Sequence, residues 1–327
     1  MTTILPVASG KGGVGKTVCT ANLGVALARA GKTVILVDLD LGGSNLHTCL
    51  GQRNNRAGIG NLILKQEQGL ESLLTDTAER RLYFIPGDSL LPGSANLSWF
   101  RKQKILSELP LLVADYVLLD LGAGTSYNTL DFFLISNNGL VVIAPETTSI
   151  LNAYSFIKSA LFRLLYRSFD NRSPERQIIT EFGSGRLEGS DAKLSSLIQR
   201  LGQHNPQSGE LAQQRMAEFM PRVILNMGRN NADIQIGARL RQIVQRNLEI
   251  DINYVGFVPH EARVARSIID RTPAFASDPA SPFSQAMATV ADRLQNAPMP
   301  PPAELFADNS DLDSLRRDAS QQPQADR

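Results

Sequence analysis

The sequence is short of cysteine, of long apolar runs and of excess charge. It has two cysteines, Cys19 and Cys49, which are too few for a framework of disulfides. No run approaches the roughly 18 consecutive apolar residues that a membrane-spanning helix needs, so we expect no such helix. The formal net charge of +1 argues against a nucleic-acid-binding surface that covers the protein, although it leaves room for a local basic patch.

The N-terminal stretch also lacks the features of a secretion signal. It reads MTTILPVASGKGG, with neither a basic segment nor a long apolar one, and we expect it to form the first strand of a folded domain. Hydrophobic residues make up 43% of the 327 residues, which is enough for a sizeable core. We therefore expect a cytoplasmic globular protein.

Short apolar runs alternate with helical patterns along most of the chain. Several runs show no alternation of apolar and polar positions, which is typical of strands buried on both faces of a parallel sheet. The runs are residues 4–8, 33–38, 82–86, 116–120, 140–144, 222–226 and 254–258. Helical patterns over 17–30, 150–166 and 283–294 lie between or after them, and Gly31 suits a left-handed helix end. The sequence predicts an α/β fold, a doubly wound and mostly parallel sheet of roughly seven or eight strands with helices on both faces.

Two segments break this alternation. Residues 168–221 are rich in serine, glycine, glutamine and charge, and we expect two amphipathic helices there, near 191–201 and 208–219. This helical insertion is either a solvated addition at the rim of the sheet or a surface for a partner. Residues 296–327 are rich in proline and acidic residues, so we predict a disordered tail after one domain over 1–295.

A glycine-rich stretch fills every position of the phosphate-loop template G-x-x-x-x-G-K-[ST], between a predicted strand and a predicted helix. Its residues are Gly10, Lys11, Gly12, Gly13, Val14, Gly15, Lys16 and Thr17. The glycines let backbone N–H groups turn toward phosphate oxygens, and the helix N-terminus adds partial positive charge. Lys16 is expected to reach the terminal phosphates and the Thr17 hydroxyl to ligate Mg²⁺. The motif predicts that 1–295 is a P-loop domain.

Aspartates end two of the predicted strands. Asp38 and Asp40 lie two positions apart, on one face of an extended segment that neighbours the phosphate loop. Asp120 ends an apolar strand and fits the carboxylate that holds Mg²⁺ through water, while Gly122 and Gly124 after it allow a mobile loop. Thr17, Asp38 and Asp120 would give Mg²⁺ the hard oxygen partners that it prefers.

The stretch from Lys11 to Thr17 reads KGGVGKT and is similar to the deviant Walker A pattern of the MinD/ParA ATPase family. The resemblance covers roughly 3–167 and 222–294. It implies Mg·ATP as the ligand and an ATP-dependent homodimer in which Lys11 contacts phosphates across the interface. It also implies that Asp40 orients or activates the attacking water and that Asp38 supports the Mg²⁺ shell. With Lys16, Lys11 and Asp40 would then carry the hydrolysis of ATP.

Two later predicted strands bear on which nucleotide base is bound. No N/T-K-x-D motif, which reads guanine, follows a late strand, and this favours ATP over GTP. The resemblance to MinD places Asn226 and Pro259, at the ends of two predicted strands, against adenine.

Two further stretches resemble the flagellar-number regulators FlhG and FleN within this family. They are DLGAGTSYN from Asp120 and VIAPETTSILNAYSFIK from Val142 to Lys158. The resemblance implies a switch that controls the placement of cell structures, such as flagella or a division site, with a protein partner that stimulates hydrolysis.

The surface on which such a switch acts stays open. A peripheral membrane anchor in the tail would use Leu305, Phe306, Leu312 and Leu315, whose acidic neighbours oppose binding to anionic lipid. A ParA-like switch would instead bind nonspecific DNA through exposed basic residues. The candidates are Arg239, Arg241, Arg246, Arg263, Arg266, Arg271 and Arg293.

Two other classes of P-loop protein lack their signatures here. An iron–sulfur ATPase needs cysteines near the loop after Asp120 or as a C-x-x-C pair, and neither Cys19 nor Cys49 fits. A tyrosine autokinase of polysaccharide export needs a C-terminal tyrosine cluster, and no tyrosine follows Tyr254.

Overall fold

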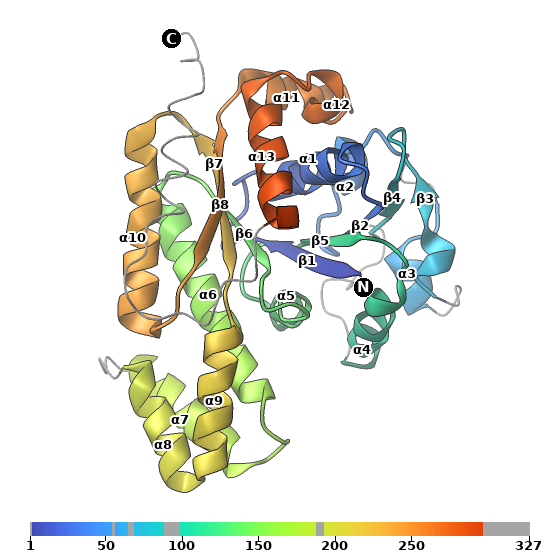
Figure 1. Cartoon of the computed structure of the whole chain (residues 1–327). Helices are drawn as coiled ribbons and strands as arrows, with labels where there is room; N and C mark the ends of the chain where they lie inside the picture. Colours follow the sequence, from blue (N-terminus) through green and yellow to red (C-terminus); the bar gives the residue numbers. More distant parts are fainter. Residues whose placement is uncertain (1, 54–55, 65–68, 88–98, 188–192, 297–327) are drawn as a thin grey trace.

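The structure is a computed structural model that describes residues 2–53, 56–64, 69–87, 99–187 and 193–296 (Figure 1). In these residues eight strands form one sheet in the order β3-β4-β2-β5-β1-β6-β7-β8. The strands are β1 (Thr3–Ala8), β2 (Val34–Leu39), β3 (Thr75–Asp76), β4 (Leu82–Ile85), β5 (Tyr116–Leu121), β6 (Leu140–Ile143), β7 (Arg222–Gly228) and β8 (Asn253–Pro259). All pairings are parallel except that of β3 with β4.

The predicted fold class is confirmed, and each predicted strand lies within three residues of an observed one at either end. The added strand, β3, is two residues long and therefore too short to give an alternating pattern. Every residue of β2 and β5 is buried, as expected for central strands that are covered on both faces.

Helices cover both faces of the sheet (Figure 1). One face packs against α1 (Lys16–Arg29), α2 (Leu46–Cys49), α12 (Ala274–Ser277) and α13 (Pro282–Asn296), which share one apolar core. The other face packs against α3 (Ile59–Ile63), α4 (Trp99–Glu108), α5 (Tyr127–Phe133), α6 (Thr147–Arg167) and α10 (Asn231–Leu248), which share a second core. The helix α11 (Ala262–Ile269) connects β8 to α12, and two short 3-10 helices are η1 (Glu71–Leu73) and η2 (Leu109–Leu111). Among the residues described, every helix is too short or too polar to cross a bilayer.

Two helical features that the sequence predicted are found, the end of the first helix and the last helix. α1 ends beside Gly31, which has a φ of 88°, a conformation that favours glycine. The predicted last helix is α13, which contacts α1 and β8 and buries Phe283 and Met287 completely.

The segment between α6 and β7 differs from the prediction because it holds three helices instead of two. They are α7 (Pro174–Leu187), α8 (Leu194–His204) and α9 (Pro206–Glu218), which extend beyond one end of the sheet (Figure 1). The missed helix, α7, contains Gly183 and Ser184, which weaken a helical pattern, but buried Ile179 and Phe182 join it to the second core. The division of the chain at 295 stays a prediction, and residues 297–327, including the predicted tail anchor, lie outside the described residues.

Candidate nucleotide-binding site

The register of three neighbouring parallel strands gathers the predicted site residues. In the ladder between β2 and β5, Asp38 lies opposite Asp120, and in the ladder between β1 and β5, Val7 lies opposite the same Asp120. β1 ends at Ala8, the phosphate loop begins two residues later at Gly10, and α1 begins at Lys16. The carboxyl ends of β1, β2 and β5 therefore place the loop and the aspartates at one edge of the sheet, where α/β proteins bind ligands.

The loop backbone is bent at its glycines and held from two sides. Gly13 and Gly15 have φ angles of 82° and 81°, which few other residues adopt. A Cβ on Gly15 would lie 2.3 Å from Nδ2 of Asn226, and one on Gly10 would lie 2.2 Å from the backbone of Asn152. On Gly12 and Gly13, by contrast, a Cβ would meet no atom within 4 Å. The loop is thus clamped at its base and open at its crest, which suits the approach of phosphate groups.

Lys16 lies inside the site beside carboxylates. Its Nζ donates a 2.7 Å hydrogen bond to Oδ1 of Asp120 and lies 3.9 Å from Oδ2 of Asp40. Asp120 has no exposed surface, and Thr20, one turn along α1 from Lys16, donates to it at 3.1 Å. Oδ2 of Asp120 is buried without a hydrogen-bond partner. The terminal-phosphate lysine and the predicted metal carboxylate are therefore in direct contact.

Asp38 holds the loop that follows β2. Its carboxylate accepts hydrogen bonds from the hydroxyl of Ser44 at 2.6 Å and from the backbone N–H groups of Asp40 and Leu46 at 3.1 Å each. Burial and the neighbouring charge of Asp120 raise the pKa of Asp38 to about 7, against the lowering effect of these hydrogen bonds. Its observed partners make Asp38 an organiser of this loop, and its part in the Mg²⁺ shell stays a prediction.

Asp40 is more open than the other two carboxylates, with 28% of its side chain exposed. Burial raises its pKa, while Lys16 lowers it and Asp120 raises it further. A partly exposed carboxylate at this edge, next to Lys16, can accept a proton or a hydrogen bond from water at the terminal phosphate. The geometry fits the role that the sequence predicted for Asp40.

Lys11 forms its hydrogen bonds with other side chains than Lys16 does. Its Nζ donates to Oε2 of Glu146 at 2.5 Å and to the hydroxyl of Thr148 at 3.1 Å, both at the start of α6. The side chains of Lys11 and Glu146 are 28% and 58% exposed. Lys11, the first lysine of the motif, is therefore partly exposed and paired within its own chain.

The residues present fit a magnesium ion that is completed by phosphate and water. The half-buried Thr17 hydroxyl and the unpartnered Oδ2 of Asp120 are hard oxygen donors beside the loop. In the described ranges no group of three or more His, Cys, Asp or Glu side chains could hold a metal by itself.

Asn226 lies two residues before the end of β7 and Pro259 ends the neighbouring strand β8, and of the two only Asn226 has a recorded hydrogen bond to the loop. Its Nδ2 donates to the carbonyl oxygen of Val14 at 2.8 Å, and the residue is 4% exposed. Pro259 lies opposite Gly228 in the ladder of β7 with β8 and is half-buried. The observed work of Asn226 is to fix the phosphate loop, and contact of either residue with adenine stays a prediction.

Three residues of the site were missed from the sequence. Thr20 contacts Asp120, Ser44 contacts Asp38, and Glu146 pairs with Lys11. The spacing of Thr20 to Lys16, one helical turn, was a usable signal because such residues share a helix face. Ser44 and Glu146 gave none, since their contacts depend on how loops fold back.

Comparisons with known proteins give a family match and several relatives. The sequence model of the CobQ/CobB/MinD/ParA nucleotide binding domain matches residues 5–274. The antiactivator FleN of Pseudomonas aeruginosa is 25% identical over 299 residues, which cover 91% of this chain and 88% of FleN. The flagellum site-determining protein YlxH of Helicobacter pylori is 33% identical over 166 residues, or 48% of this chain and 53% of YlxH. The chain thus matches FleN over most of its length and YlxH over about half.

Solved structures share the fold. The septum site-determining protein MinD of Pyrococcus horikoshii, solved with Mg-ADP, has a TM-score of 0.59 and 20% identity over 90% of this chain and 97% of its own. The MinC:MinD cell division complex of Aquifex aeolicus gives a TM-score of 0.60 and 24% identity over 91% and 97%. At these identities the likeness concerns the fold, and it agrees with the doubly wound sheet described above.

Proposed function

The chain belongs to the CobQ/CobB/MinD/ParA nucleotide-binding family, and on that premise we propose that it is a Mg·ATP-dependent switch that dimerises with ATP and hydrolyses it. The observation that carries the proposal is the division between the two loop lysines. Lys16 is buried inside the site against Asp120, whereas Lys11 is partly exposed and pairs with the exposed Glu146. A lysine that contacts the nucleotide of its own subunit must lie inside the site. A lysine that contacts the nucleotide of a second subunit must be accessible from outside.

The chemistry follows from the groups at the loop. Backbone N–H groups, Lys16 and the N-terminus of α1 neutralise the terminal phosphate, and Lys11 of a second subunit adds charge as the bond to the γ-phosphate breaks. Asp40 orients the attacking water. Thr17 and Asp120 would hold Mg²⁺, which would supply positive charge to the phosphate groups. Asp38, through Ser44 and Leu46, ties the loop after β2 to the sheet, so this loop can report whether the γ-phosphate is present.

The proposed cellular task is the placement of a structure such as a flagellum or a division site. The names of FleN, YlxH and MinD, an antiactivator and two site-determining proteins, support this class of task. We infer that a protein partner stimulates hydrolysis and that the switch works in the cytoplasm, with the inner face of the membrane as its surface.

DNA partitioning is the alternative. Of its candidate arginines, Arg239, Arg246 and Arg271 are exposed, whereas others are buried or paired within the chain. Arg241 is 3% exposed and donates to the carbonyl oxygen of Ile252 at 2.8 Å. Arg263 and Arg266 are exposed, but each pairs with an aspartate, Asp278 or Asp270. A salt-sensitive complex of the ATP-bound protein with nonspecific DNA would favour this alternative over membrane placement.

Calorimetry and light scattering test the proposal together. Titration of Mg·ATP into the full chain is expected to saturate at one nucleotide per chain, with weaker binding of Mg·GTP. Light scattering is expected to show a monomer with Mg·ADP and a dimer with Mg·ATP. A folded protein that gives neither heat nor saturation with Mg·ATP would refute nucleotide binding, and saturation without a change of mass would refute only the dimer.

A further inference from the structure

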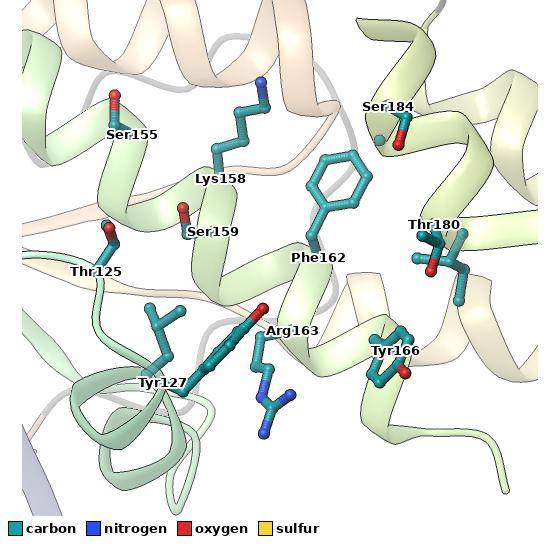
Figure 2. Close-up of a pocket in the computed structure, with 13 residues that line it drawn as sticks. Thr125, Tyr127, Ser155, Lys158, Ser159, Phe162, Arg163, Tyr166, Thr180 and Ser184 are labelled. Carbon is teal, nitrogen blue, oxygen red and sulfur yellow. The ribbon is translucent and has the colours of Figure 1, made fainter. Parts of the chain in front are cut away.

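A groove lies between α5, α6 and α7, apart from the phosphate loop (Figure 2). Its volume is about 890 Å³, within the range of pockets that bind ligands. Figure 2 shows Lys158, Phe162 and Arg163 on α6, with Tyr127 on one side of them and Thr180 and Ser184 on the other. None of the residues predicted to bind nucleotide lines it. The groove is therefore separate from the predicted nucleotide site.

The walls offer apolar surface and hydroxyl groups. Leu130, Phe162 and Ile179 line the groove, Phe162 stacks on Phe182 of α7 at 6.2 Å between ring centroids, and Tyr127 is 70% exposed. An exposed aromatic ring beside apolar walls is typical of surfaces that bind proteins. Five serine and threonine side chains line the same groove and can form hydrogen bonds with a peptide backbone. They are Thr125, Ser155, Ser159, Thr180 and Ser184.

The groove is positive. Its lining residues in the described part of the chain include Lys158 and Arg163 but no aspartate or glutamate. The buried carboxylate of Asp131, which contacts the groove residue Arg163, is shared by three cations: Arg163 donates to it at 2.8 and 2.9 Å, Arg167 at 3.1 Å, and Lys102 pairs with it as well. One carboxylate cannot balance three cations, so a net positive field remains at the foot of α6.

We propose that this groove binds a short acidic segment of a partner protein, with one or two large apolar side chains flanked by aspartate or glutamate. The apolar side chains would pack against Phe162 and Ile179, and the carboxylates would lie near Lys158 and Arg163. A nucleic acid fits less well, because it needs a row of cations along its backbone, whereas here apolar walls separate the cations. The inference does not rest on ATP hydrolysis. Because α7 of the insertion forms one wall of the groove, the proposal also assigns a class of partner to the insertion.

The place of the groove gives such a partner access to the nucleotide loop. Thr125 and Tyr127 line the groove and follow Gly124, whose N–H donates to the carbonyl of Ser9 at the end of β1. Tyr127 in turn lies under the guanidinium of Arg163, 4.8 Å from the ring centroid. A bound segment would thus touch the chain that joins Asp120 to α5.

The test selects the occupant without assuming its sequence. Random 12-residue peptides displayed on phage are selected on the immobilised full chain. The expected consensus has acidic residues around an aromatic or leucine residue. A synthetic consensus peptide with a fluorescent label is then titrated with the full chain, and its affinity is expected to fall as salt rises.

Two variants locate the peptide. A Cβ on Gly183 meets no atom within 4 Å, so Gly183→Leu is expected to project into the groove and to stabilise the helix α7. We expect Gly183→Leu and Lys158→Glu each to weaken binding at least tenfold. Arg200→Glu, the same reversal on exposed α8 outside the groove, is expected to leave the affinity unchanged.

Several results would overturn the proposal. A consensus without acidic residues, or equal binding by the wild type and Gly183→Leu, would remove the groove as the site. Binding of a synthetic peptide of residues 297–327 that is lost in Gly183→Leu would assign the groove to this chain instead. Self-association lost in the same variant would assign it to a second copy, and a labelled 12-nucleotide DNA lost in it would assign it to nucleic acid.

Discussion

Nζ of Lys16 and Oδ1 of Asp120 lie 2.7 Å apart, and both side chains are almost completely buried. The pair joins the first turn of α1 to the end of β5. It also means that the lysine expected at the terminal phosphate starts from a protein carboxylate, so binding of Mg·ATP must exchange one anion for another. Loss of Lys16 would leave Asp120 buried next to Asp38 without its cation.

The first prediction concerns this pair. Lys16→Ala is expected to abolish measurable binding of Mg·ATP and, by leaving a buried charge, to lower the free energy of unfolding by about 3 kcal/mol. Calorimetry measures the first and urea denaturation the second. Lys16→Gln keeps a donor for Asp120, so it should restore much of the stability and none of the binding. Wild-type affinity in Lys16→Gln would contradict the role of the charge.

The second prediction concerns Asp40. Asp40→Ala removes the partly exposed carboxylate beside Lys16 while leaving the loop, Lys16 and Asp120 in place. We expect ATP to stay bound, hydrolysis to fall by at least about 100-fold as a base or orienting group is lost, and the dimer to persist. Size exclusion with light scattering after incubation in Mg·ATP measures whether the dimer persists. A monomer that holds ATP would show that Asp40 is needed for dimerisation as well.

The third prediction separates Lys11 from its partner in the same chain. Lys11→Ala is expected to bind Mg·ATP but to lose both dimerisation and hydrolysis. The exposed pair with Glu146 contributes only about 0–1 kcal/mol, so the variant should fold as the wild type does.

Glu146→Gln is the matched variant, because it frees Lys11 without removing it. The dimer with ATP should then form as well as in the wild type, or up to about fivefold more tightly, since the lysine leaves a weaker partner. Sedimentation across a range of protein concentrations gives the dissociation constants of the wild-type and Glu146→Gln dimers. Normal turnover by Lys11→Ala would end the idea of a lysine that acts across the interface.

The fourth prediction concerns the thiols. Burial, with the charge of Asp120, raises the pKa of Cys19 to about 12, and burial raises that of Cys49 to about 11. Only the thiolate reacts with disulfide reagents, and at pH 8 its population falls roughly a thousandfold when the pKa rises by three units. We expect Ellman's reagent at pH 8 to detect no thiol in the native protein and two after denaturation. A fast-reacting native thiol would place one of them at the surface.

Much of the fold was predictable because its signals are local. Buried strands such as 116–120 and helices such as 283–294 appear as apolar patterns within a few residues of their observed ends. The strand β3 and the helix α7 were not predictable. β3 is too short for a pattern, and α7 has weak helical propensity that is offset by the burial of Ile179 and Phe182.

By itself the sequence determined the phosphate loop. The glycines at 13 and 15, the lysine at 16 and the aspartates that end β2 and β5 follow from local spacing, since backbone conformation and strand ends depend on near neighbours. Only the tertiary structure decided three pairings. Asn226 donates a hydrogen bond to Val14, Glu146 forms an ion pair with Lys11, and Arg163 forms an ion pair with Asp131 beside the groove. Those pairs join residues that are distant in the chain, and no local pattern records which distant side chains the sheet order brings together.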